Sequence, residues 1–233
     1  MNILITGSNG FIGKNLSKYL REKSCHNIIP FNKTDKLTSI NFGNIDFVIH
    51  LAAVHRSNNE NDFIKYNINF TEDLISACST YNVPIIYTSS IQSDLKTPYG
   101  ESKKVCEKMI ENYRNKSKYC KIFKLTNTFG EYSNPNHLSV VSTFCYNISH
   151  DKPVTIHDHD KIINFTYIGD VVKRIAESIS YIYEPEIISI QPQYSITLTK
   201  LYSIIKDIKN GSNNSSDLEE KLRMTYNYFK GLA

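Results

Sequence analysis

Three residues have the types and spacing needed for proton and hydride chemistry: Ser90, Tyr99 and Lys103. Tyr-x-x-x-Lys places a phenol and an ammonium on one helix face, one turn apart. The positive charge is expected to lower the phenol pKa from roughly 10 toward neutral pH. Tyr99 can then exchange a proton with a carbonyl or alcohol oxygen that Ser90 orients, while hydride moves at the attached carbon. The lysine would also reach the ribose hydroxyls of a nicotinamide cofactor. These residues predict the catalytic set of a dehydrogenase or reductase.

The spacing alone is not specific, because Tyr-x-x-x-Lys begins four times in the chain, at Tyr19, Tyr99, Tyr202 and Tyr226. Only Tyr99 follows soon after an apolar run that ends in hydroxyls, PIIYTSS at 84–90. Position therefore selects Tyr99, and the alternative is a surface Tyr–Lys pair.

The glycines that a cofactor site needs stand at the start of the chain, in MNILITGSNGFIG. Gly7, Gly10 and Gly13 follow a short apolar run and open an apolar pattern with helical period. Glycines allow a tight turn and a close approach to a pyrophosphate, and the start of a helix attracts the anion. The stretch predicts a dinucleotide site.

The end of the second expected strand, 26–31, bears on the choice of cofactor. A carboxylate about 20 residues after the glycines normally holds the ribose 2′-hydroxyl of NAD. Here the strand is followed by Asn32 and Lys33, and Asp35 is a weaker candidate for that role. A lysine favours the 2′-phosphate, so NADP(H) is expected and NAD(H) is possible; the alternative is a solvated loop lysine.

Strand and helix patterns alternate along the rest of the chain. This alternation predicts an α/β fold, a Rossmann-like doubly wound parallel sheet with a small C-terminal substrate-binding subdomain. Residues 1–130 would be mainly dinucleotide-binding and 131–233 mainly substrate-binding. The small residues Ala52 and Ala53 after the third strand leave room for the cofactor. Further strands are expected at 46–51, 84–90, 121–126, 154–156, 164–168 and 187–190, helices at 61–81, 99–115, 140–148, 169–179, 197–208 and 217–230, and a polar linker at 209–216.

Composition narrows the class of protein. The 233 residues carry a net charge of +4 with scattered basic residues, which argues against a nucleic-acid partner. No apolar run approaches the roughly 20 residues of a membrane span. The five cysteines form no C-x-x-C, and the first residues enter a strand directly, so a cytoplasmic protein with reduced thiols is expected. HDHD at 157–160 is interpreted as a polar turn, and no metal site is expected.

Together these pieces resemble the extended short-chain dehydrogenase/reductase family that acts on nucleotide sugars, also described as NAD-dependent epimerases and dehydratases. A finer likeness is to the reductase half of bacterial capsule and O-antigen enzymes on the N-acetyl-L-fucosamine route. It is carried by SSIQ followed soon by PYGESK, by PNHLSVVSTFCYNI at 135–148 and by DLEEKLRMTY. The family motifs are TGSNGFIG at 6–13, HLAA at 50–53, YNINFTEDLI at 66–75, SSIQ at 89–92, YGESK at 99–103, TNTFG at 126–130 and FTYIGDVV at 165–172.

The resemblance implies that the 4-keto group of a UDP-linked 2-acetamido-2,6-dideoxy-hexos-4-ulose is reduced with NADPH. Such enzymes also carry a cupin domain with epimerase activity, which would begin where these residues stop, so epimerisation is expected to come from elsewhere. A homodimer is implied as well, formed by packing of the helix that bears Tyr99. Val105, Met109 and Ile110 suit that packing, or equally the core of the subunit.

The resemblance also implies roles for individual residues. Asn127, Asn136 and His137 would face the sugar nucleotide together with Ser90, and Arg56 is a further candidate unless it is simply solvated. An arginine that many relatives use for the diphosphate is replaced by Asn164. The residues implied for the cofactor are Gly7, Asn9, Gly10, Phe11, Ile12 and Gly13 at the pyrophosphate, Asn32 and Lys33 at the adenosine, and Leu51, Ala52, Ala53, Asn67, Ser89, Tyr99 and Lys103 at the nicotinamide side.

Two other functions remain open. The first is a nucleotide-sugar 4-epimerase or 4,6-dehydratase with bound NAD, although Ile91 and Gln92 stand where dehydratases usually have Asp-Glu. The second is a non-catalytic NADP-binding sensor or scaffold module. An intact Ser-Tyr-Lys set favours the enzyme.

Overall fold

The computed structural model describes residues 1–233 except 117–119, 138, 181–186, 213–215 and 233. The described chain forms two compact units. The first comprises Met1–Leu125 and Val172–Ile190, and the second Thr126–Val171 and Gln191–Ala233. The chain therefore passes between the units more than once, because Val172–Ile190 returns to the first unit. The middle of the expected linker lies outside the described residues.

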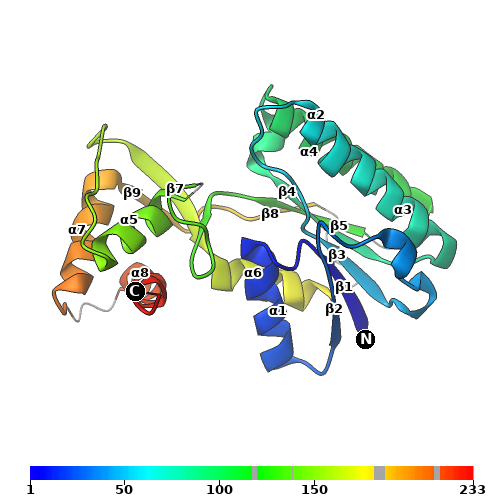
Figure 1. The fold of residues 1–233 in the computed structure, drawn as a ribbon, viewed down its shortest axis with the longest axis horizontal. Helices are drawn as coiled ribbons and strands as arrows, with labels where there is room; N and C mark the ends of the chain where they lie inside the picture. The colour runs from blue at the N-terminus through cyan, green and yellow to red at the C-terminus, as the bar shows by residue number, and fades with distance from the viewer. Residues whose placement is uncertain (117–119, 138, 181–186, 213–215, 233) are drawn as a thin grey trace. The chain divides into compact units, whose positions relative to one another are not determined.

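The first unit is built on a six-stranded sheet in the order β2-β1-β3-β4-β5-β8 (Figure 1). All five neighbouring pairs are parallel. β1 lies between β2 and β3, so the strand order reverses at β1, and ligands of doubly wound sheets bind beyond the carboxyl ends of the strands at such a point. This confirms the expected α/β fold. The strands are β1 (Asn2–Thr6), β2 (Asn27–Phe31), β3 (Phe47–His50), β4 (Ile85–Ser90), β5 (Cys120–Leu125) and β8 (Ile187–Ser189).

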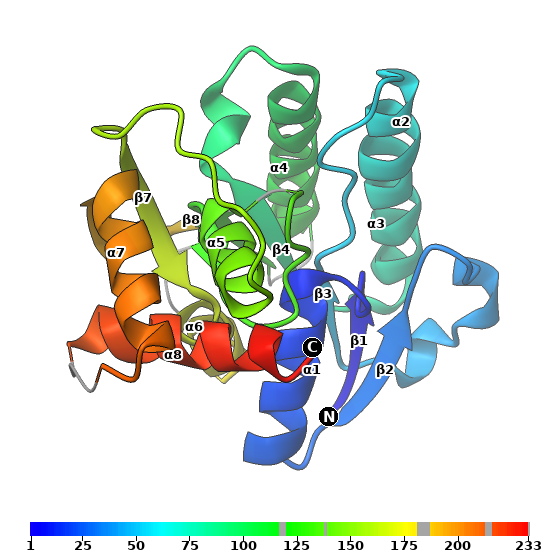
Figure 2. The same ribbon diagram turned by 60° about the vertical axis from the view of Figure 1, so that its left-hand side comes forward.

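Helices cover both faces of this sheet (Figures 1 and 2). α1 (Phe11–Lys23) packs on β1 and β2. α3 (Phe70–Tyr81) and α4 (Pro98–Lys116) pack side by side on the opposite face, and α4 contacts β4 and β5. α6 (Ile168–Ser178) runs from one unit into the other. None of the helices in the described ranges is long and apolar enough to cross a bilayer.

One expected helix, 61–81, contains an irregular turn. It consists of α2 (Asn61–Phe63), a π-helical segment η3 (Ile64–Asn69) and α3. The carbonyl of Asn67 accepts hydrogen bonds from the Thr71 hydroxyl at 2.6 Å and the Cys106 thiol at 3.4 Å. Side-chain donors that compete for a helical carbonyl accompany such local widening. Short 3₁₀ turns lie at Leu37–Ser39, Phe42–Asn44 and Ile91–Asp94.

The second unit has a small mixed sheet and three helices. β7 (Ile162–Tyr167) pairs parallel with β6 (Thr128–Phe129) and antiparallel with β9 (Tyr194–Thr197). The helices α5 (Val140–Ser149), α7 (Leu198–Lys209) and α8 (Asp217–Lys230) pack on one another. α8 begins with a capping box in which Ser216 and Glu219 satisfy each other's backbone amides. The mixed sheet confirms the small subdomain.

The strand expected at 154–156 is wrong, because these residues are not in a strand. Pro153 has no amide hydrogen to donate, and its carbonyl accepts from the Asn147 side chain at 3.0 Å. β6 and β9 were not expected. Both are short, and both exist through pairing with β7, which local sequence does not encode.

Candidate active site

The glycine turn between β1 and α1 is shaped by contacts that a side chain would block. Gly7 has φ +69°, and a Cβ there would lie 2.9 Å from the Ala52 Cα. A Cβ on Gly13 would lie 2.3 Å from the Gly7 carbonyl oxygen. The two glycines therefore allow the turn to approach the end of β3 and the helix to approach the turn.

The start of α1 fits an anion. Gly10 caps the helix without a side chain, and the first turn, which begins with Phe11 and Ile12, has no acidic residue. The first amides of a helix have no intrahelical acceptor and carry the positive end of the dipole. The amide of Asn9 and the hydroxyl of Ser8 donate to the Asn32 side chain at 2.9 and 3.0 Å, which holds the loop open. The turn thus offers backbone amides and no negative charge, which suits the predicted pyrophosphate role; that role stays a prediction.

Near the end of β2 lie one carboxylate and two ammonium groups whose contacts differ. The Asp35 carboxylate accepts from the Asn32 amide at 2.7 Å, so it is committed to its own turn. The exposed Lys33 ammonium lies 4.5 Å from the centre of the Tyr66 ring. Lys65 lies 5.1 Å from the same ring centre. Two ammonium groups therefore lie close to one aromatic ring. Asn32 supports the loop through its side chain.

Tyr99 lies at the start of α4, and its side chain is nearly enclosed, with 9 % exposed. Its ring stacks on His55 at a centroid distance of 5.3 Å. Burial raises the pKa of Tyr99 to about 12, while a hydrogen bond with the Ser90 side chain lowers it. The catalytic part of Ser90 and Tyr99 stays a prediction. The expected lowering of the phenol pKa is wrong for the protein alone, because desolvation of the phenolate dominates.

Lys103 is buried beneath Tyr99's helix turn rather than paired with the phenol. Its ammonium donates to the Thr88 carbonyl at 2.8 Å and lies 4.6 Å from the centre of the Tyr87 ring. Burial lowers the pKa of Lys103 to about 8, and Cys106 and Glu107 raise it. A lysine with such a pKa changes charge close to physiological pH, which is a property of functional sites.

A buried hydrogen-bonded chain joins the end of β1 to the helix before α4. The Thr6 hydroxyl lies 2.7 Å from His50 Nδ1, and His50 Nε2 lies 3.0 Å from the Thr71 hydroxyl. Thr71 donates to the Asn67 carbonyl, so its oxygen accepts from Nε2–H and Nδ1 accepts from Thr6. Burial lowers the pKa of His50 to about 3, with the Lys103 charge adding to the effect. His50 is therefore neutral at pH 7.

The Asn67 side chain continues this chain to the catalytic helix. Its carbonyl oxygen accepts from the Val54 amide at 2.7 Å, and its amide donates to the Ser102 hydroxyl at 3.0 Å. Ser102 in turn donates to the Tyr99 carbonyl at 2.7 Å. Asn67 thus acts on the loop after β3 and on α4, with its side chain 2 % exposed. The signal for His50 was available in the sequence, as a polar residue inside the apolar run DFVIHL.

The other residues predicted for the nicotinamide side lie at the ends of β3 and β4. Leu51 is buried, and Ala52 and Ala53 are half-buried. The Ser89 hydroxyl donates to Glu107 at 2.5 Å, so its oxygen is left only as an acceptor. Arg56 is exposed in the loop after β3.

Three residues predicted for the substrate lie in the second unit. The Asn127 amide donates to the Asn164 carbonyl at 3.3 Å. Asn136 is exposed with φ +60°, and its backbone amide donates to the Thr143 hydroxyl at 2.9 Å. His137 is exposed next to it. Their part in substrate binding stays a prediction.

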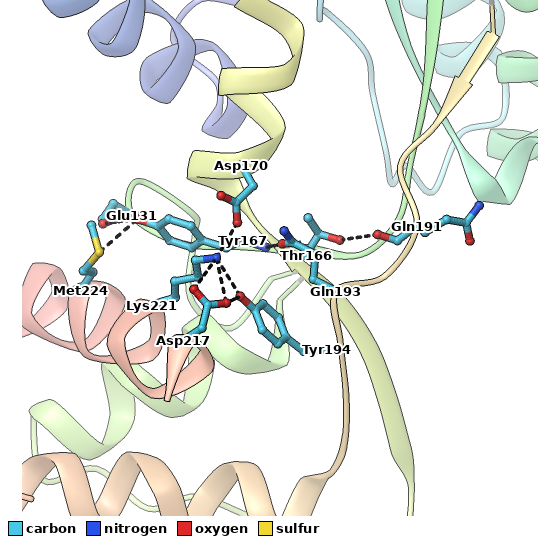
Figure 3. A network of polar contacts seen from close by, with 10 residues as sticks. All are labelled: Glu131, Thr166, Tyr167, Asp170, Gln191, Gln193, Tyr194, Asp217, Lys221 and Met224. Carbon is cyan, nitrogen blue, oxygen red and sulfur yellow. Dashed lines mark hydrogen bonds and ion pairs between the residues drawn. The ribbon is translucent and has the colours of Figure 1, made fainter. Parts of the chain in front are cut away.

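Sequence reasoning missed a polar cluster of the second unit, centred on Lys221 of α8 (Figure 3). Its ammonium donates to Asp170 and to the Tyr194 hydroxyl, each at 2.8 Å, and to Asp217 at 3.1 Å. Tyr194 also donates to Asp217. The cluster ties α8 to β9 and to the FTYIGDVV segment.

The same segment is held by two further contacts drawn in Figure 3. The Tyr167 hydroxyl donates to both Glu131 oxygens at 2.9 Å, and the Tyr167 amide donates to the Gln193 side chain at 3.2 Å. Burial raises the pKa of Tyr167, and the neighbouring Glu131 adds to this shift. These contacts give Tyr167 of the FTYIGDVV segment a structural role in the second unit.

The structure describes all five cysteines. Cys25 is exposed and the other four cysteines are buried, all as free thiols. Across the described parts of the chain, no three His, Cys, Asp or Glu side chains gather where they could hold a metal ion.

Similar proteins match this arrangement over most of the chain. A reductase of Pseudomonas aeruginosa, UDP-2-acetamido-2,6-beta-L-arabino-hexul-4-ose reductase, is 31 % identical, with 97 % of this chain aligned. The capsular polysaccharide assembling protein CapF of Staphylococcus aureus is 27 % identical, with a TM-score of 0.86 over 98 % of this chain. The chain spans only 64 % and 66 % of the lengths of these two relatives.

A third relative shares the fold over its full length. The UDP-glucuronic acid 4-epimerase of Bacillus cereus, solved with NAD, is 19 % identical with a TM-score of 0.85, covering 100 % of this chain and 99 % of that one. The sequence profile of the NAD dependent epimerase/dehydratase family matches residues 3–190. The glycine turn, the Ser90–Tyr99 pair and the buried lysine all lie within that range. The chain therefore belongs to the NAD-dependent epimerase/dehydratase family.

Proposed function

We propose that this protein reduces the 4-keto group of a UDP-linked 2-acetamido-2,6-dideoxy-hexos-4-ulose with NADPH. The observation that carries the proposal is the placement of Ser90 at the end of β4 and of the enclosed Tyr99 at the start of α4, in the unit that also holds the glycine turn. The likeness to the Pseudomonas aeruginosa reductase supports this choice of substrate.

Each residue of the set has a distinct task in such a reduction. The reduced nicotinamide supplies the hydride for carbon 4. Tyr99 donates a proton to the keto oxygen, and its raised pKa of about 12 keeps the phenol protonated at neutral pH. Ser90 orients the same oxygen through its hydroxyl. Lys103 contributes a buried positive charge beneath the phenol.

The preference for NADPH is supported by the end of β2. Lys33 is exposed and is held near the Tyr66 ring, and Asp35 is engaged by the Asn32 amide. A ribose 2′-phosphate gains from an ammonium, whereas a ribose hydroxyl needs the carboxylate that is committed elsewhere. Gly7, Asn9, Gly10, Phe11, Ile12 and Gly13 would hold the pyrophosphate.

The sugar nucleotide would be held by five residues that the family resemblance implies. We propose Arg56 and Ser90 in the first unit and Asn127, Asn136 and His137 in the second. The 4-keto sugar would serve nucleotide-sugar synthesis for a polysaccharide, in the cytoplasm.

We further propose a homodimer that uses α4. Val105 is 37 % exposed and Met109 is half-buried, so both can contribute to a helix packing surface. Ile110 is 1 % exposed and belongs to the subunit core, so only the first two remain candidates for the dimer.

The test is to mix the purified protein with candidate UDP-4-keto-6-deoxy sugars and NADPH. We expect loss of NADPH absorbance with one 2-acetamido substrate, and NMR of the product should show a hydroxyl at carbon 4. Consumption of NADPH with none of the UDP-4-keto sugars would contradict the proposal.

The same preparation separates the rival functions. A 4-epimerase would carry tightly held NAD through purification and interconvert UDP-sugars without consuming NADPH. A sensor or scaffold module would bind NADPH and leave every sugar unchanged.

A further inference from the structure

Glu107 is a buried carboxylate that the proposed set does not use. It lies on α4, four residues after Lys103, and is 6 % exposed. One oxygen accepts from the Ser89 hydroxyl at 2.5 Å, and the other lies 3.5 Å from the Lys124 ammonium. Burying a carboxylate costs free energy unless the carboxylate is paired or hydrogen-bonded. The contacts of Glu107 therefore indicate what this residue does.

The neighbours of Glu107 include a partly buried cation. Lys124 is 16 % exposed at its side chain and supplies a positive charge. Asp94, which is more exposed, contacts Lys124 at 3.2 Å and Lys104 at 3.3 Å. The buried carboxylate is therefore balanced by a lysine whose second partner lies at the surface.

The surroundings of Lys103 leave its charge with little support. The ammonium donates to the Thr88 carbonyl of β4 and faces the Tyr87 ring. His50 of β3 is neutral, and the phenols of Tyr87 and Tyr99 have raised pKa values, so none of the three offers a negative charge.

On its own helix, Lys103 is acted on by Cys106 and Glu107. Both are buried, and Glu107 is the carboxylate of the two. Residues four apart on a helix are neighbours on one face, so Glu107 lies on the face of α4 that bears Lys103.

We propose that Glu107 is a positioning residue of the catalytic site, which keeps Lys103 charged at neutral pH and, through Ser89, holds the strand end that bears Ser90. This inference rests on the proposed reductase function. Glu107 does not touch the reacting atoms; it acts through Lys103 on one side and through β4 on the other.

The direction of the effect follows from electrostatics. Burial favours the neutral amine and lowers the pKa of Lys103 to about 8, and the Glu107 charge opposes this shift. Removing that charge moves the pKa of Lys103 further down, so that more of the amine is neutral at pH 7 to 8. The reductase then loses activity at a lower pH than the unchanged protein.

The first experiment is the pH profile of kcat/KM for NADPH-dependent reduction by Glu107→Gln. We expect the alkaline limb of this profile to lie about one pH unit below that of the unchanged protein. Above pH 8 the kcat/KM of Glu107→Gln should then fall short of that of the unchanged protein by a factor approaching tenfold. Glu111→Gln, one helical turn further from Lys103, is the matched control and should keep the original limb. If the alkaline limb of Glu107→Gln lies at the same pH as that of the unchanged protein, the proposal is overturned.

Glu107→Asp provides a second variant if Glu107→Gln does not fold. It keeps the charge but withdraws it by one methylene, so its limb should lie between those of the unchanged protein and Glu107→Gln. A limb that does not move in Glu107→Asp contradicts the proposal when this is the only folded variant.

A second measurement needs no activity. Thermal unfolding is followed for the unchanged protein, Glu107→Gln, Lys103→Met and the double variant at pH 7 and pH 10. If Glu107 supports the lysine charge, Glu107→Gln should lower Tm at pH 7 more when Lys103 is present than in Lys103→Met, and this difference should shrink at pH 10. Equal losses in both backgrounds at both pH values would reject the coupling. A protein that shows the coupling but reduces none of the sugars would leave the inference standing and reject the proposed function instead.

Discussion

Thr6 and His50 are joined across neighbouring parallel strands by a hydrogen bond of 2.7 Å between the threonine hydroxyl and Nδ1. The same threonine oxygen accepts from the backbone amides of Leu51 and Ala52, each at 3.2 Å. The residue before the glycine turn thus positions the end of β3, against which Gly7 packs. A neutral imidazole is required for this arrangement, because Nδ1 must accept.

This requirement makes stability depend on pH. The His50 pKa is about 3 in the folded protein and 6.5 when unfolded, so the unfolded chain binds the extra proton between these values. Stability is therefore present above pH 6.5 and is lost as pH falls toward 3, with about 2 kcal/mol lost at pH 5. The drop in Tm from pH 7 to pH 5 should be larger for the unchanged protein than for His50→Gln, because glutamine does not titrate. Equal losses in the two proteins would contradict a neutral buried His50.

Tyr99→Phe should remove the proton donor and little else. Loss of a general acid costs about 10²- to 10⁴-fold in rate, and the ring that stacks on His55 is kept. We expect kcat to fall by that factor while NADPH binding, followed by fluorescence, stays unchanged. Tyr202→Phe is the control, because Tyr202 has the same spacing to Lys206 but lies on α7 in the second unit. Activity retained by Tyr99→Phe would remove Tyr99 from the mechanism.

Lys33 should decide between the two cofactors. Lys33→Ala removes an exposed ammonium, so the loss is that of a partly solvated charge contact, about 1 kcal/mol or roughly fivefold in the Kd for NADPH. The Kd for NADH should not change, since it has no 2′-phosphate. Lys36→Ala, exposed in the same loop, serves as the control. Equal weakening of both cofactors would show that Lys33 does not select between them.

Lys221 should contribute more to stability than an ordinary surface lysine. Lys221→Met leaves Asp170 and Asp217 without their shared cation, and we expect a loss of about 1–2 kcal/mol in thermal unfolding. Lys173→Met is the comparison, because its pair with Glu177 is exposed and spans 4.0 Å. That variant should lie within about 0.5 kcal/mol of the unchanged protein. Similar losses in both would show that the Lys221 cluster has no special weight.

Much of the fold could be predicted because its signals are local. The segments that become β1, β3, β4 and β5 are short, each contains an apolar run, and nearly all their residues are buried, as expected for strands covered on both faces. The terminal helix at 217–230 was placed correctly because its capping box is written in adjacent residues. The strand expected at 154–156 failed because an apolar, β-branched run is not enough where no neighbouring strand pairs with it.

The electrostatics of the site could not be predicted, since burial is a property of the whole fold. The helical spacing of Tyr99 and Lys103 suggested that the ammonium would acidify the phenol. Burial instead raises the pKa of Tyr99 and lowers that of Lys103, so it favours the neutral form of both side chains. The Lys103 ammonium donates to the Thr88 carbonyl. Spacing along a helix gives neighbours on a face, but the dielectric around them depends on what packs there.

The amino-acid sequence by itself determined the chemistry available to this protein: a glycine turn for a dinucleotide, and a serine, a tyrosine and a lysine near the end of a parallel strand. Those features depend on residue type and short-range spacing, which the sequence states directly. Only the tertiary structure decided that Asn67 and His50 connect the turn to the catalytic helix and that Glu107 lies among the buried charges. Hydrogen bonds and desolvation act through space, between residues that the sequence separates by 18 to 44 positions.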